Sequence, residues 1–78
     1  MHPAIIEVHA LDNHILEVLF DNGERGQLDM APYLEIGVFQ RLKKAEQFQQ
    51  VKVAFDTVEW ACGVDLDPEF VYRQALKG

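Results

Sequence analysis

Three carboxylates near the C-terminus, Asp65, Asp67 and Glu69, form the most chemically suggestive pattern in the chain. Hard divalent cations prefer clustered carboxylate oxygens, so a small metal-dependent or hydrolytic enzyme is one hypothesis. A structural role competes with it. Asp67 precedes Pro68, and this order is typical of a helix start at which the Asp67 side chain accepts backbone hydrogen bonds. We expect capping, with no metal and no cofactor, and the cap leaves Asp65 unexplained.

The other reactive groups are one cysteine, Cys62, and three histidines, His2, His9 and His14. Their spacing matches no zinc signature, and a single cysteine forms no intramolecular disulfide. Cys62 has the apolar parity of a strand, which is typical of a small buried hydrophobe, and we expect the histidines at a solvated edge. The sequence therefore predicts no catalytic residue.

Basic residues gather at Arg41, Lys43 and Lys44, a candidate anion site. On one short helix such cations usually form a solvated face, because nucleic-acid footprints span more basic surface. The whole chain has 7 Lys+Arg and 13 Asp+Glu, a net charge of −6 that repels a phosphate backbone. We expect no nucleic-acid binding by this chain alone. DNA binding as an accessory subunit within a complex remains an alternative.

The 78 residues are 49% apolar and 26% charged, the composition of one globular domain over residues 1–78. A chain of this size buries only about three-fifths of its open surface, so its stability is expected to be marginal, and a partner or a second copy would add to it. No secretory leader pattern and no run of about 20 apolar residues is seen. Together with the single cysteine, this predicts a cytoplasmic protein with no membrane segment.

Alternating apolar residues predict strands over about 4–10 and 14–20, and the turn residues that follow predict a third strand. A three-residue loop ending at Gly23 pairs position i with 44 − i, which places Leu28 opposite Leu16 on one apolar face. The same register leaves Ile15 and Leu19 on the outer face of the hairpin, where another element of the chain, a second copy or nothing could cover them.

The second half of the chain predicts a helix, a hairpin and a terminal helix. Apolar spacing places an amphipathic helix at about residues 37–46. Apolar residues then alternate through Phe55, and a reversal at Asp56-Thr57 pairs i with 113 − i, so that Trp60 meets Val53 in the core. A slightly wider loop of the same parity is an equal alternative, because the branched Thr57 side chain resists positive φ. The last helix starts after Asp67 and is expected to run to Leu76 or Lys77 and close at Gly78. We expect an α+β fold: an antiparallel sheet of about five short strands, in the order β-β-β-α-β-β-α, with both helices packed on it.

Three motifs span most of the chain: Phe20-x-Asn22-Gly23, the segment from Phe39 to Phe48, and Trp60-x-x-Gly63-x-Asp65-Leu66-Asp67-Pro68-Glu69 followed by Tyr72. In these motifs the chain resembles the bacterial domain of unknown function 2442 (DUF2442) family. The family more typically has Pro-Asn where this chain has Ala61 and Cys62. The resemblance implies a small α+β domain without an established activity, often encoded beside another small protein in arrangements that look like toxin–antitoxin pairs.

We therefore expect a non-enzymatic interaction module, the acidic, antitoxin-like member of such a pair. Its partner would be a small protein or a second copy, bound through the outer hairpin face. The candidate partner-binding residues are Ile15 and Leu19, with Tyr33 as a neighbour, because branched apolar side chains on a polar face favour an interface. Structural roles are expected for Asn22, Gly23, Trp60, Gly63, Asp65, Asp67, Pro68 and Tyr72.

Overall fold

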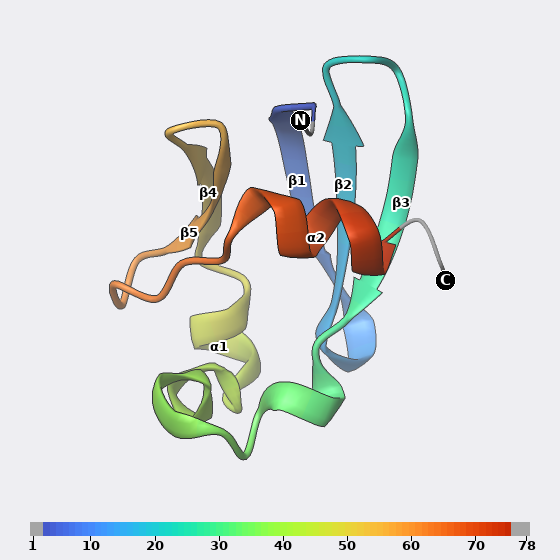
Figure 1. Ribbon diagram of the computed structural model, residues 1–78. Helices are drawn as coiled ribbons and strands as arrows, with labels where there is room; N and C mark the ends of the chain where they lie inside the picture. Colours follow the sequence, from blue (N-terminus) through green and yellow to red (C-terminus); the bar gives the residue numbers. More distant parts are fainter. Residues whose placement is uncertain (1–2, 76–78) are drawn as a thin grey trace.

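The computed structural model describes residues 3–75 and has an α+β fold (Figure 1). Its strands form one antiparallel sheet of three strands and one of two: β1 (Ile5–Leu11), β2 (Ile15–Phe20) and β3 (Arg25–Asp29), then β4 (Val51–Ala54) and β5 (Thr57–Trp60). The helical segments are short: η1 (Asp12–His14), η2 (Ala31–Tyr33), η3 (Gly37–Leu42), α1 (Ala45–Phe48) and α2 (Pro68–Ala75). Helix α2 crosses one face of the three-stranded sheet and contacts β3 (Figure 1). No helix among residues 3–75 is long and apolar enough to cross a membrane.

The expected single sheet is divided into two. Strands β1 and β4 lie next to each other, and the Ile5 N–H donates to the Asp56 carbonyl oxygen at 3.1 Å. However, β1 and β4 form no ladder, and the register of β1 against β2 shifts between Ile5 and Glu7. Because a bulge bends a strand and interrupts its hydrogen bonding, we attribute the division of the sheet to this irregularity.

The β2–β3 hairpin has the predicted register, with Leu16 opposite Leu28 and Val18 opposite Gly26. Gly23 closes the loop with a φ of 88°, in the left-handed region that favours glycine. The Phe20 N–H donates to the Glu24 carbonyl oxygen at 2.9 Å, and the Asn22 Oδ1 accepts the Glu24 N–H at 3.0 Å. The Asn22-Gly23 motif therefore has a local structural role.

The predicted helix over 37–46 is broken into η3 and α1. Lys44 between them is extended, with a ψ of 129°, so the helical face does not continue. In addition, η3 is a 3-10 helix with about three residues per turn, which changes the side chains that share a face. Val38, expected on the apolar side, is 52% exposed as a result.

The predicted register of the β4–β5 hairpin was wrong: Trp60 pairs with Val51 rather than Val53. The turn is centred one residue earlier, at Phe55 (φ 53°) and Asp56 (φ 67°). Two positive φ angles are the pattern of a type I′ turn, and the register moves by two positions, which preserves the face of every side chain. Phe55, expected in the apolar alternation, is 95% exposed at the tip.

Replacing the turn with Asn and Gly (Phe55→Asn, Asp56→Gly) is expected to stabilise the fold by about 1 kcal/mol, because these residues tolerate positive φ far better than phenylalanine does. Urea denaturation followed by circular dichroism measures the change. Phe55→Ala is the matched control, since it removes the exposed ring but keeps a non-glycine residue at positive φ, and little gain is expected from it. An unchanged or lower stability of the double variant would show that the turn is not strained.

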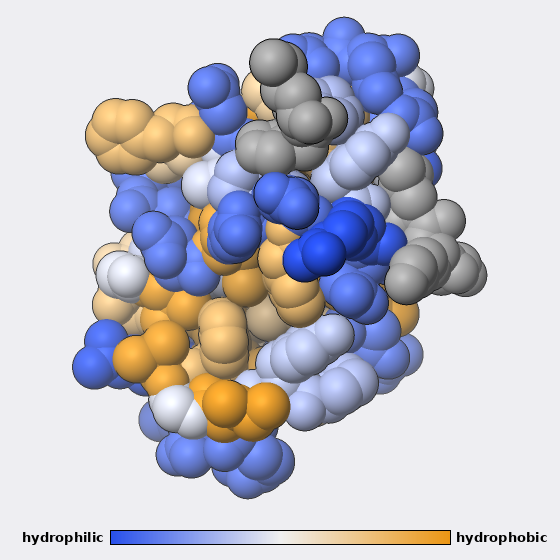
Figure 2. Space-filling model, in the orientation of Figure 1, coloured by the Kyte–Doolittle hydropathy of each residue, from blue (hydrophilic) through white to orange (hydrophobic). Residues whose placement is uncertain are grey.

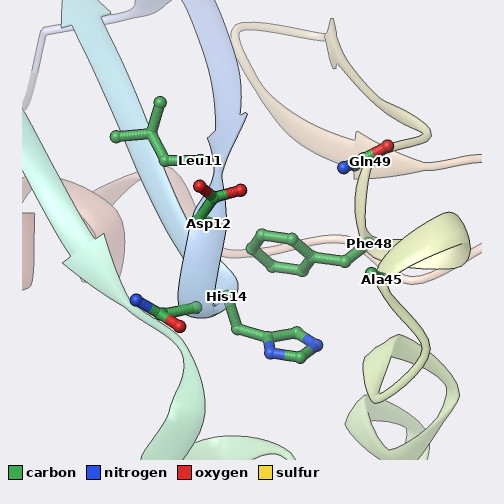
Figure 3. Close-up of a pocket in the computed structure, with 7 residues that line it drawn as sticks. Leu11, Asp12, His14, Ala45, Phe48 and Gln49 are labelled. Carbon is green, nitrogen blue, oxygen red and sulfur yellow. The ribbon is translucent and has the colours of Figure 1, made fainter.

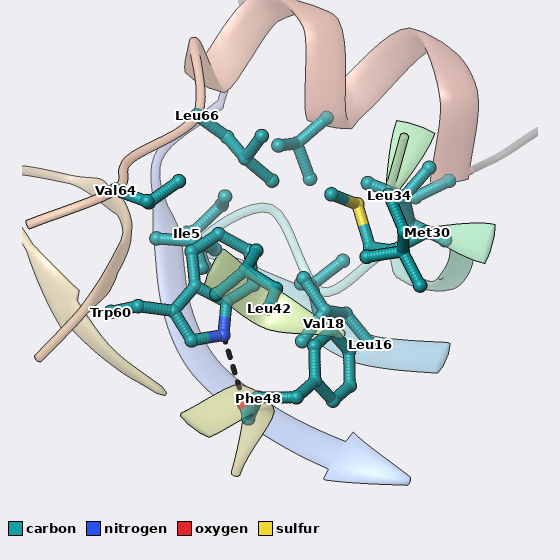
Figure 4. Packing of buried hydrophobic residues seen from close by; sticks show 14 of the residues in the cluster. Ile5, Leu16, Val18, Met30, Leu34, Leu42, Phe48, Trp60, Val64 and Leu66 are labelled. Atoms are coloured by element: carbon teal, nitrogen blue, oxygen red, sulfur yellow. Dashed lines mark hydrogen bonds between the residues drawn. The ribbon is translucent and has the colours of Figure 1, made fainter. Parts of the chain in front are cut away.

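The core is one cluster of buried apolar side chains contributed by both sheets and by the helical segments (Figure 4). Trp60 lies within it with 1% of its surface exposed, and its indole Nε1–H donates to the Phe48 carbonyl oxygen at 2.9 Å. The predicted core position of Trp60 is thus confirmed. Its neighbours in the cluster include Ile5, Leu16, Val18, Phe20, Met30, Leu42, Val58 and Val71.

Helix α2 begins as predicted. The Asp67 Oδ1 accepts the Glu69 N–H at 3.1 Å, and the Asp67 carbonyl oxygen accepts the Val71 N–H at 3.1 Å. Pro68 takes the first helical position, where its missing N–H costs no hydrogen bond. The predicted end of this helix at residues 76–78 lies outside the described residues.

Candidate functional site

The outer face of the three-stranded sheet carries the two predicted partner-binding residues of the hairpin. Gly26 of β3 lies against Ala75 of α2. The even-numbered side chains of β2 and β3 therefore point toward the helix, and the odd-numbered side chains point away from it. Ile15 and Leu19 belong to the second set and are half-buried. Their predicted placement on the outer face is confirmed.

Leu11 extends this apolar surface and was missed by the sequence reasoning. It lies directly opposite Ile15 in the β1–β2 pair and is 37% exposed. Leu11 has the same odd-numbered parity as the polar residues Glu7 and His9 of this strand. This parity could have placed it on the outer face from the sequence alone. We call Leu11, Ile15 and Leu19 the outer apolar set. Glu17 lies between the last two on β2, Glu7 and Arg25 lie opposite Leu19, and Asp29 lies opposite Ile15.

Tyr33 is not part of this set. Its ring packs edge-on against Phe70 of α2, with 5.5 Å between ring centroids, on the opposite side of the sheet. Tyr33 instead lines an open groove of about 410 Å³ below α2, where Figure 2 shows apolar surface. The remaining lining residues are Phe39, Asp65, Leu66, Asp67, Phe70 and Arg73. Because Tyr33 follows β3 and the chain turns under the helix there, sequence parity could not place it.

The three C-terminal carboxylates do not form a common site. Asp67 caps α2, and the N–H that it accepts belongs to Glu69. Asp65 is exposed and forms an isolated antiparallel bridge with Glu59, so its backbone extends the edge of β5. Within residues 3–75, no three His, Cys, Asp or Glu side chains gather in a way that could hold a metal ion.

The histidines and the cysteine are dispersed. His9 is exposed, His2 lies outside the described residues, and Cys62 is half-buried beyond the end of β5. His14, expected at a solvated edge, is half-buried: its Nε2 hydrogen-bonds to the Lys43 carbonyl oxygen at 2.9 Å. Its ring packs edge-on against Phe48 beside a small cavity of about 80 Å³ (Figure 3). This cavity is too small for an ordinary organic ligand.

The basic residues do not form a common patch, because the helix expected to carry them is broken. The Lys43 Nζ pairs with the Glu35 carboxylate at 2.8 Å, and the Arg41 guanidinium donates to the Cys62 carbonyl oxygen at 3.5 Å. Lys44 is exposed in the extended link before α1. Two of the three candidate cations therefore already have partners within the chain.

A comparison with family models gives one finding. Residues 5–77 match the model of a family described as protein of unknown function, DUF2442. The chain belongs to the DUF2442 family. No curated protein and no solved structure matches it.

The motif residues of this DUF2442 protein have structural roles in the fold. Gly63 has a φ of 94°, and the turn around it returns the chain so that the Trp60 N–H donates to the Val64 carbonyl oxygen at 2.7 Å. A left-handed conformation at Gly63 is what allows this tight reversal. The segment then runs along β5 to the cap of α2, with the Leu66 N–H donating to the Val58 carbonyl oxygen.

Tyr72 of α2 forms a contact between this helix and the β2–β3 loop of the DUF2442 domain. Its hydroxyl donates to the Glu24 Oε1 at 2.6 Å, and the Asn22 side-chain amide donates to the same oxygen. This hydrogen bond to Glu24 raises the pKa of the Tyr72 hydroxyl above 10.0, and desolvation and the nearby Glu24 charge act in the same direction. The contact ties α2 to the β2–β3 loop, 48 residues away in sequence.

The raised pKa predicts the pH dependence of stability. The folded state holds the Tyr72 proton to higher pH than the unfolded chain, so the stabilisation is complete below pH 10 and is lost as pH rises through the folded pKa. We expect Tyr72→Phe to lower the thermal midpoint at neutral pH and to reduce its decline above pH 10. Melting curves between neutral pH and about pH 11 measure both effects. Equal declines in the two proteins would contradict this role.

Proposed function

We propose that this DUF2442 chain is a non-enzymatic protein-interaction module, the acidic, antitoxin-like member of a two-component pair in the bacterial cytoplasm. Its outer sheet face would bind a small basic protein. The observation that carries the proposal is the outer apolar set, which remains partly exposed on the sheet face that α2 does not cover.

The composition of this face suits a protein partner. Interfaces combine an apolar centre with a polar rim, and here the aliphatic side chains lie among charged residues, the carboxylates Glu7, Glu17 and Asp29 outnumbering the one arginine, Arg25. A net charge of −6 favours encounter with a basic protein and disfavours acidic competitors. The apolar contacts would provide affinity, and the charges would provide selectivity and association rate.

Co-expression with the protein encoded by the adjacent gene tests the proposal. We expect a complex to co-purify, and Ile15→Glu combined with Leu19→Lys to abolish it. The matched control is Ile36→Glu with Val38→Lys, which makes the same changes in charge at exposed apolar positions before and within η3. Binding that survives the first pair, or that is lost only with the second, would contradict the assignment of the outer face.

The same proposal predicts no metal-dependent chemistry at Asp65, Asp67 and Glu69. Calorimetric titration with Mg²⁺, Mn²⁺, Ca²⁺ and Zn²⁺ should give no binding heat.

The proposal also predicts that this chain alone does not bind DNA, because an acidic chain is expected to need a basic partner to do so. A mobility shift of DNA by this chain alone at physiological salt would count against a role limited to protein binding.

A further inference from the structure

Strand β3 leaves one edge of the three-stranded sheet without a neighbouring strand in the described part of the chain (Figure 1). Its even-numbered positions face β2: the Glu24 carbonyl oxygen accepts the Phe20 N–H, and the Met30 N–H donates to the His14 carbonyl oxygen. Antiparallel ladders alternate, so the backbone N–H and C=O groups of the odd-numbered residues point away from β2. These residues are Arg25, Gln27 and Asp29, and all three are exposed.

The side chains along this edge are self-complementary in charge. Arg25 and Asp29 lie two residues on either side of Gln27, with opposite charges. An antiparallel copy of the same strand, related by a two-fold axis at Gln27, places each Arg25 directly opposite the Asp29 of the other copy. Charged residues usually protect an edge strand from pairing, but here the order of charges favours one specific pairing with itself.

We propose that β3 pairs antiparallel with β3 of a second copy of this chain, forming a two-fold symmetric dimer with one continuous sheet. In the register centred on Gln27, each odd-numbered residue faces an odd-numbered residue, so all their outward backbone groups meet. Three such pairs arise, and each exchanges two backbone hydrogen bonds. The interface is isologous and closes on itself, as in most homodimers.

The charges also select against other registers. Shifting the copies by four residues places Arg25 opposite Arg25, or Asp29 opposite Asp29, and like charges directly opposite are destabilising. A shift by one residue would bring outward backbone groups of one copy against inward-facing groups of the other. A shift by two residues keeps the outward backbone groups opposite one another but separates Arg25 from Asp29. The register centred on Gln27 is therefore the one that pairs the outward backbone groups and also places the opposite charges together.

Contacts among residues 3–75 leave these groups available. The Arg25 guanidinium lies 4.0 Å from the Glu17 carboxylate, and its side chain is 58% exposed. One oxygen of Asp29 accepts the Ala31 N–H at 3.0 Å, and a carboxylate can accept further bonds. Gly26 and Leu28, whose backbone groups face β2, take no part in the proposed pairing.

Charge reversal on the full chain tests the dimer, with mass measured by sedimentation equilibrium from micromolar to millimolar concentration. Arg25→Asp and Asp29→Arg each create two like-charged pairs, and we expect each to weaken dimerisation about tenfold or more. The double variant restores opposite charges at both pairs and should dimerise within about threefold of the original chain. Lys44→Glu, an exposed change of equal net charge to Arg25→Asp, is the control and should have no effect.

A wild-type chain that remains monomeric throughout the concentration range would overturn the proposal. So would a dimer that resists both single reversals, or one that the double variant fails to restore while circular dichroism shows a folded chain. Mixing adds an independent readout: the double variant should form few mixed dimers with wild type, because its reversed charges then meet like charges. Free mixing would place the interface elsewhere. These outcomes are separate from those for the basic partner, which concern Ile15 and Leu19.

Discussion

Trp60→Ala is expected to leave the chain largely unfolded at room temperature. Replacing a buried tryptophan by alanine costs about 3–5 kcal/mol, and a domain of this size has a total stability of roughly 4–12 kcal/mol, with small domains near the lower end. The substitution removes the ring from the centre of the core and leaves the Phe48 carbonyl oxygen without the indole donor. The two losses act together because the same side chain fills the core and completes the hydrogen bond.

Far-UV circular dichroism with urea titration measures this effect, since the variant has lost the chain's single tryptophan and its fluorescence. Trp60→Phe is the informative control. It retains an aromatic ring but not the donor, so we expect an intermediate loss of about 1–3 kcal/mol. A Trp60→Ala protein with a native spectrum and cooperative unfolding at similar urea concentration would show that the two sheets pack independently of Trp60.

Gly26→Ala is expected to destabilise the fold by about 1–3 kcal/mol, as overpacking in a closely packed region does. A Cβ atom at Gly26 would lie 2.9 Å from the Ala75 carbonyl oxygen and 3.0 Å from the Ala75 Cβ. Since the oxygen belongs to the helix backbone, a change of rotamer cannot relieve the contact. The end of α2 would have to move away from β3.

Urea denaturation measures the cost, and hydrogen exchange of the α2 amides locates it. Gln27→Ala, at the next position of the same strand with an exposed side chain, is the control and should change stability by less than about 0.5 kcal/mol. Equal stability of the Gly26→Ala and Gln27→Ala variants would mean that α2 does not approach β3 as closely as in the structure.

The two proposed interfaces are compatible. Partner binding uses the outer face of the three-stranded sheet, and dimerisation uses the edge of β3. In the proposed dimer the two outer faces lie in one continuous sheet, so two copies of the outer apolar set, with their carboxylates, would be presented on the same side. A partner with two basic surfaces would then gain affinity by binding both.

Features encoded by neighbouring residues were predictable from the sequence. The register of β2 against β3 follows from the Gly23 loop, because turn geometry and the parity of apolar residues both act over a few positions. The Asp67 cap is equally local, since the bond that it accepts comes from two residues along the chain. The same parity placed Ile15 and Leu19 on the outer face.

Features that depend on distant contacts required the tertiary structure. Parity could not place Tyr33 beside Phe70, because the path of the chain under α2 decides that contact. The β4–β5 turn uses Phe55, a poor turn residue, so local preference did not determine the register there. The sequence thus determined the Gly23 loop and the Asp67 cap. Only packing between distant segments decided that Gly26 must lack a side chain, and that within residues 3–75 β3 has a neighbouring strand on one side only.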